Sequence, residues 1–147
     1  HTGVEVSPVA MVPPTQTCMN CHAMVKTDSP KLAPLRESWE TGTPLRWVRI
    51  HKVPDYAYFD HSAHVSVGVG CESCHGNIAE MEEALLDQPL SMGWCLECHR
   101  NPDPHLRPVE DITVMGWTPP ADQSARAAAI KTALDINPPE TCSGCHR

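Results

Sequence analysis

The chain has 147 residues, a formal net charge of -7, fifteen Pro, eight Cys and nine His, but only one Phe, two Tyr and four Trp. So few large apolar side chains exclude an extensive conventional core, and small chains of this kind depend on disulfides, metals or cofactors. The negative charge argues against a nucleic-acid partner, and the absence of an apolar run of about 18 residues argues against a membrane-spanning helix.

The first recognisable element is residues 13–22, in which an extended Pro-rich stretch leads into Cys18, Cys21 and His22. The same pattern, two cysteines separated by two residues and followed directly by histidine, occurs three more times and uses every cysteine. The later copies are Cys71, Cys74 and His75; Cys95, Cys98 and His99; and Cys142, Cys145 and His146.

This pattern is the attachment signature of c-type haem. Two thiols add to the two vinyl groups of one porphyrin, and the adjacent imidazole becomes the proximal ligand of the iron. The sequence therefore predicts four covalently attached haem c groups, with the eight cysteines as attachment residues and His22, His75, His99 and His146 as iron ligands.

Two other interpretations of the cysteine pairs are structural zinc and thiol redox chemistry. In a zinc site, two Cys-x-x-Cys pairs close one tetrahedral centre and the following histidine is a coincidence. Histidine would follow all four pairs by chance with a probability of roughly one in 100,000, so haem is favoured. No cysteine remains for a separate disulfide framework.

Three short helices are predicted from apolar periodicity. Residues Leu32–Glu40 place two apolar side chains four apart and stop at Gly42, whereas Ile78–Asp87 carries Ile, Met and Leu on one stripe. The third, Gln123–Asp135, begins after Asp122 as a cap. We expect the apolar faces of these helices to lie on haem.

Four internal histidines remain for the distal positions of four haems. His51 follows the extended segment 47–50, and His105 lies in a stiff loop between prolines. His61 and His64 follow Asp60, a predicted N-cap, and their spacing of three places both imidazoles near one face of a helical turn. They could reach two neighbouring irons.

Two alternatives remain open for the distal ligands. These histidines could be ordinary surface residues, or a methionine could bind an iron and raise its reduction potential. The candidate thioethers are Met11, Met19, Met24, Met81, Met92 and Met115, with Met92 expected to pack beside a porphyrin.

Together these features predict a mostly irregular fold with a few short α-helices, in which the haems form the core. The apo-chain should be largely unfolded, because porphyrin faces supply the apolar area that the side chains lack. Haem of this type is attached outside the cytoplasmic membrane in bacteria, which predicts a periplasmic location.

The pattern Phe59-x-His61-x-x-His64 ahead of a haem motif resembles the small class III multihaem cytochromes. In that family the first histidine usually ligates the haem that follows and the second ligates a neighbouring haem. The resemblance implies that His61 pairs with His75 and that His64 serves another haem.

Longer strings resemble the pentahaem cytochrome c subunit of bacterial alternative complex III. They are residues 13–22, 29–34, 36–39, 49–52, 89–95 and 105–108. In such subunits a further haem motif lies upstream, and its last residue would fall on His1. His1 is thus a candidate proximal ligand of a fifth haem whose cysteines are absent here, or else an unpaired N-terminal histidine.

We expect residues 1–147 to form a single multihaem domain. The chain would be a processed form or a fragment of a longer one that carries the further haem motif upstream. No signal peptide is visible in the sequence. The resemblance implies an electron-transfer subunit, not an enzyme by itself, on the periplasmic side of the membrane. It would receive electrons from an iron-sulfur subunit after quinol oxidation and pass them to a monohaem subunit, a soluble carrier or an oxidase. Partner subunits or a missing anchor would attach it.

The alternative function is a multihaem reductase in which one haem keeps an open coordination position and acts on a small oxyanion. A zinc-stapled interaction module is the third hypothesis.

Overall fold

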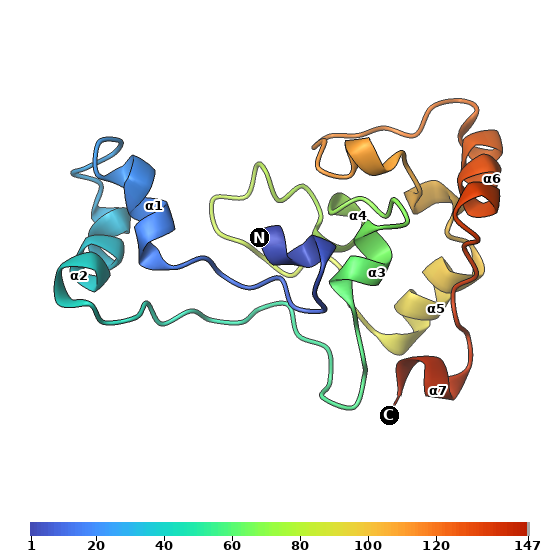
Figure 1. Ribbon diagram of the computed structural model, residues 1–147, viewed down its shortest axis with the longest axis horizontal. Helices are drawn as coiled ribbons and strands as arrows, with labels where there is room; N and C mark the ends of the chain where they lie inside the picture. Colours follow the sequence, from blue (N-terminus) through green and yellow to red (C-terminus); the bar gives the residue numbers. More distant parts are fainter. Residues whose placement is uncertain (147) are drawn as a thin grey trace.

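The structure, a computed structural model, describes residues 1–146 (Figure 1). Short helices joined by long irregular segments make up this part of the chain. It contains no β-strand, only two isolated antiparallel bridges, Ala57 to His146 and Val69 to Leu106. The predicted fold class, mostly irregular with a few short α-helices, is confirmed.

The α-helices of the described residues are α1 (Thr15–His22), α2 (Ala33–Thr41), α3 (His61–Val65), α4 (Glu72–His75), α5 (Met92–Arg100), α6 (Gln123–Ala133) and α7 (Cys142–Cys145). Short 3-10 turns are η1 (Thr2–Glu5), η2 (Pro30–Leu32), η3 (Asp103–His105) and η4 (Val109–Asp111). Among these helices, none has the length and apolar character needed to cross a membrane.

Helices α1 and α2 lie side by side at one end of the molecule, apart from the other helices (Figure 1). The Thr15 and Ser38 hydroxyls share a hydrogen bond of 3.1 Å, and Leu35 of α2 is buried. Two extended stretches, residues 9–14 and 42–50, connect this pair to the rest of the chain. The predicted helix Leu32–Glu40 is therefore confirmed as α2.

The body of the molecule has little side-chain core. Its buried apolar residues are Leu106, Ile112 and Ala127, whereas many large apolar side chains are exposed, among them Tyr56 at 66% and Leu85 at 64%. At η3, Gln123 of α6 donates hydrogen bonds to two backbone carbonyl oxygens, those of Asp103 and Leu106. The apolar area buried by protein atoms alone is small, as expected for a chain whose core is its cofactors.

The predicted helix Ile78–Asp87 is wrong, because these residues form an irregular loop. Gly76 takes a positive φ of 65° and begins a turn, and a Cβ built on it would lie 2.5 Å from Cγ of Asp87. The loop thus closes on itself. Its apolar residues Ile78 and Met81 are only partly buried, and so short a helix is marginal without extensive tertiary contacts.

Candidate haem-binding sites

All four Cys-x-x-Cys-His motifs lie on or beside short helices. The first motif lies within α1 and the third within α5. The second begins at Cys71, directly before α4, and the fourth begins with α7 and ends at His146, directly after it. One helical turn brings the two thiols to the same side, with the histidine directly after them. All eight cysteines are free thiols, which leaves both members of every pair available for attachment.

Sequence reasoning missed the helices that carry the motifs. One signal for α5 was present: Ser91 is its N-cap, and the Ser91 hydroxyl accepts a hydrogen bond from the Trp94 backbone N–H at 3.3 Å. For α3 the expected cap is confirmed, since the Asp60 carboxylate accepts a hydrogen bond from the Ser62 backbone N–H at 2.8 Å.

The second, third and fourth motifs are close together. Burial, followed by the neighbouring thiols of Cys98, Cys95 and Cys71, raises the pKa of Cys74 to about 12. Burial and then Cys145 raise the pKa of Cys95. Three motifs that are distant in sequence therefore share one region, while the first motif lies with α1 and α2 (Figure 1).

Six of the nine histidines have Nδ1 hydrogen-bonded to a backbone carbonyl oxygen. The pairs are His1 with Met11 at 2.7 Å, His22 with Val25 at 3.1 Å, His61 with Pro8 at 2.7 Å, His64 with Asp60 at 2.7 Å, His99 with Pro139 at 2.7 Å and His146 with Tyr56 at 3.1 Å. A carbonyl oxygen only accepts, so Nδ1 carries the proton and Nε2 keeps its lone pair. Metal-binding histidines are held in this way.

Two pairs of imidazole rings have centres at a separation that fits an iron between them. The rings of His61 and His75 have centres 6.5 Å apart and are parallel within 3°. Those of His64 and His99 are 6.2 Å apart, with an interplanar angle of 35°. Two imidazoles bound through nitrogen at about 2 Å to opposite sides of one metal have centres about 6 Å apart.

The structure thus brings the ring of His61 close to that of His75, the pair that the class III resemblance implied, and the ring of His64 close to that of His99, a partner that the sequence left open. Phe59 packs against both distal rings, 4.8 Å from that of His61 and 4.7 Å from that of His64. These residues fit two bis-His haem sites side by side.

His51 and His105 are not brought opposite a motif histidine in this way. The His51 ring lies edge-on to that of His75 with centres 4.4 Å apart, too close for an iron between them. Its Nε2 is nevertheless buried without a hydrogen-bond partner, which suits a ligand atom. Burial lowers the pKa of His105, which favours the neutral imidazole that metals bind.

The described residues contain no cluster of three His, Cys, Asp or Glu side chains arranged to hold a metal ion. A zinc site made from two Cys pairs would require such a cluster.

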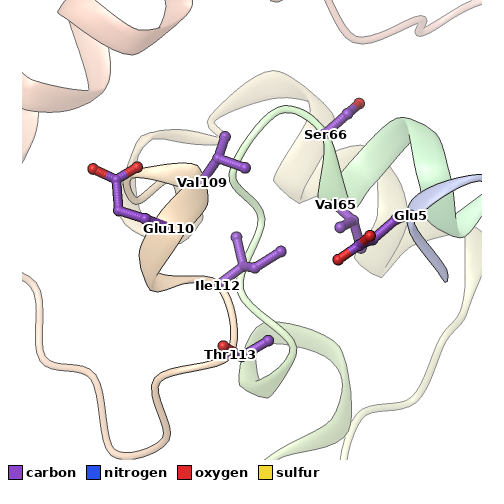
Figure 2. Close-up of a pocket in the computed structure, with 7 residues that line it drawn as sticks. All are labelled: Glu5, Val65, Ser66, Val109, Glu110, Ile112 and Thr113. Carbon is purple, nitrogen blue, oxygen red and sulfur yellow. The ribbon is translucent and has the colours of Figure 1, made fainter. Parts of the chain in front are cut away.

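A pocket of about 420 Å³ lies between the loop after α3 and the turn η4 (Figure 2). Figure 2 shows Glu5 and Val65 on one side, Val109 and Glu110 on the other, and Ile112 between them. Neither cysteine nor histidine lines it. This pocket therefore lacks the groups expected of an open haem site that binds a substrate.

Residues 57–147 match the sequence profile of the family described as cytochrome c7 and related cytochrome c. The chain belongs to this family. It is a multihaem c-type cytochrome that binds haem c covalently and transfers electrons. The matched region contains the second, third and fourth motifs of this cytochrome, and the first motif lies outside it.

This cytochrome is also similar to a curated protein of Nitratidesulfovibrio vulgaris strain Hildenborough, the multihaem cytochrome c subunit of menaquinone reductase. The two are 26% identical over 122 residues, an alignment that covers 69% of this chain. The chain spans 58% of the length of that relative.

Proposed function

We propose that this cytochrome relays electrons through four bis-His haems as a subunit of a quinone-linked membrane complex of the alternative complex III type. The observation that carries the relay is the facing of two imidazole pairs, His61 with His75 and His64 with His99. An iron with two firmly held axial ligands exchanges electrons without binding a substrate.

Closeness of the sites supports transfer between haems. Phe59 contacts both distal imidazoles, and the thiols of Cys74, Cys95 and Cys98 are near enough to influence one another. The haems of the second and third motifs would therefore be neighbours, and Cys145 of the fourth motif lies next to Cys95 of the third.

The remaining two haems take their distal ligands from His51 and His105 in this proposal. The support is the buried, unpartnered Nε2 of His51 and the half-buried position of His105, whose pKa is lowered by burial. His1, whose Nδ1 donates to the Met11 carbonyl oxygen, is oriented as a ligand would be and could serve a fifth haem.

Membership of a membrane complex rests on two likenesses. The strings shared with alternative complex III subunits run through most of the chain, and the Nitratidesulfovibrio vulgaris relative is named as a subunit of another quinone-linked enzyme. We infer an iron-sulfur subunit as electron donor, a downstream cytochrome c or oxidase as acceptor, and a periplasmic position held through partner subunits.

The ligand proposal is tested by adding carbon monoxide to the dithionite-reduced holoprotein and recording the optical difference spectrum. No spectral change is expected, because every iron has two histidine ligands. A stoichiometric change for one haem would instead favour the reductase hypothesis, and small nitrogen and sulfur oxyanions would then be tested as oxidants.

The complex proposal is tested by purifying the tagged chain from membranes in mild detergent and adding a reduced menaquinone analogue. We expect co-purified iron-sulfur and membrane subunits, and haem reduction that the isolated cytochrome does not show. Recovery of the cytochrome alone from membranes, with no response to quinol, would contradict membership of such a complex.

A further inference from the structure

Arg107 is a buried cation in the body of the molecule, with only 3% of its surface exposed. Its Nη1 donates to the carbonyl oxygens of Val114 at 2.9 Å and Asp111 at 3.4 Å, and its Cζ lies 4.6 Å from the centre of the Trp117 ring. A Cβ built on Gly70 would lie 1.9 Å from Nη2, so the guanidinium fills the space beside this glycine. Its position is therefore closely defined.

The charge of Arg107 is only partly compensated. The nearest carboxylate, that of Glu72, is 3.9 Å from Nη2, which is beyond hydrogen-bond distance. Glu72 accepts backbone hydrogen bonds from Gly116 at 2.7 Å and Trp117 at 3.4 Å instead. Nε of Arg107 is buried without an acceptor. A bidentate pair would instead donate two parallel N–H groups of the guanidinium to one carboxylate.

This cation is joined to the second haem motif through the backbone. The Arg107 N–H donates to the Gly68 carbonyl oxygen at 2.9 Å, and the adjacent Val69 and Leu106 form an antiparallel bridge. Residues 68–70 lead directly from α3 to Cys71, and Glu72 is itself a motif residue. The positive charge thus keeps a fixed position relative to the haem attached at Cys71 and Cys74.

We propose that Arg107 is a positioning residue whose buried charge raises the reduction potential of the haem attached through Cys71 and Cys74, with Glu72 as the opposing charge. The inference rests on the proposed haem sites. Reduction adds one electron from the preceding carrier to the ferric iron, and no bond is made or broken. A fixed cation disfavours the more positive ferric form. By Coulomb's law at an effective dielectric constant of about 20, a unit charge at a separation of about 10 Å from an iron would shift its reduction equilibrium roughly tenfold.

The test is a spectroelectrochemical titration of the purified holoprotein, fitted to its separate haem components. Arg107→Gln should shift the reduction equilibrium of one haem component about tenfold towards the ferric form. This lowers the reduction potential of that haem by about 59 mV for one electron. Glu72→Gln should raise the same component, and the double variant should return it towards the wild-type value. Arg107→Lys should preserve most of the potential, and Arg126→Gln, which removes an exposed arginine paired with Asp122, should shift none.

Haem content and the carbon monoxide spectrum of each preparation are measured first, so that failure of the haem sites is distinguished from failure of this inference. If Arg107→Gln does not load haem, Glu72→Gln and Arg107→Lys decide the question. The proposal then requires a raised potential in Glu72→Gln and a largely preserved potential in Arg107→Lys. Unchanged potentials in the loaded variants, with only a lower unfolding temperature, would overturn the proposal and leave Arg107 a purely structural residue.

Discussion

At the residue scale, the imidazoles are arranged by two kinds of contact. Backbone carbonyl oxygens hold Nδ1 of His61, His64 and His99, and Phe59 contacts the rings of both His61 and His64. These contacts fix the tautomer and the ring plane of each imidazole without the help of a bound metal. The rings of His61 and His64 therefore each lie close to one motif histidine, and their Nε2 atoms remain available as ligand atoms.

Replacing His61 with Ala should open one coordination position without disturbing the other haems. The expected result is a carbon monoxide shift equal to one haem per protein, because His61 faces only the ring of His75 at this spacing. His64→Ala should give an equal shift from a different haem, that of His99. The measurement is the reduced difference spectrum, normalised to the haem content.

Ser66→Ala, an exposed change just after α3, is the matched control and should behave as the wild type. A variant His61→Met supplies a thioether in place of the imidazole, so it should keep a six-coordinate iron at a higher potential. If neither alanine variant binds carbon monoxide, these two histidines are not distal ligands.

The sequence predicted the motif residues and the candidate distal histidines because haem attachment depends on local spacing. It left the partner of His64 open, since facing His99 depends on how α3 and α5 meet in space. The close approach of His51 to His75 was equally invisible, because 24 residues separate them in the chain. Such pairings come from tertiary packing.

At the element scale, helices were predicted well where local signals agreed with available contacts. Helix α6 begins at Gln123 as expected and ends at Ala133, two residues before the predicted end, where Asp135 takes a positive φ of 50°. The side chain of Asp122 does not cap it and instead accepts a hydrogen bond from Arg126. Residues 78–87 had helical periodicity but form a loop, because so short a helix is marginal without extensive tertiary contacts.

The connection between α3 and α4 depends on Gly68. This residue has a φ of 90°, and a Cβ built on it would lie 2.2 Å from the Arg107 carbonyl oxygen. Gly68→Ala should therefore destabilise the protein by about 2–4 kcal/mol through backbone strain and overpacking. The measurement is urea-induced unfolding of the holoprotein, followed by circular dichroism.

Gly42→Ala is the matched control for this prediction. Gly42 also has a positive φ, 70°, but nothing lies within 4 Å of its built Cβ. It should lose only about 1 kcal/mol, the conformational cost alone. Equal losses at the two glycines would show that the contact with Arg107 contributes nothing to stability.

At the scale of the whole molecule, three motifs share the body, whereas the first lies with α1 and α2 beyond two extended connections (Figure 1). Few side chains are buried in either part. Porphyrin must therefore supply much of the apolar contact, and the dependence of folding on haem should differ between the first motif and the others.

Removing the first haem should cost less structure than removing the third. In a variant with Cys18→Ser and Cys21→Ser, we expect three haems to remain and residues 51–146 to resist limited proteolysis, because α1 and α2 contribute little to the body. In a variant with Cys95→Ser and Cys98→Ser, the expected loss extends to the neighbouring haems, since Cys74 and Cys145 lie close to this pair. Haem content by pyridine haemochrome, and the proteolytic fragments by mass spectrometry, measure both outcomes. If the two variants lose haem and protease resistance equally, folding of the body depends on the first haem as well. The two parts would then fold as one cooperative unit, contrary to the prediction.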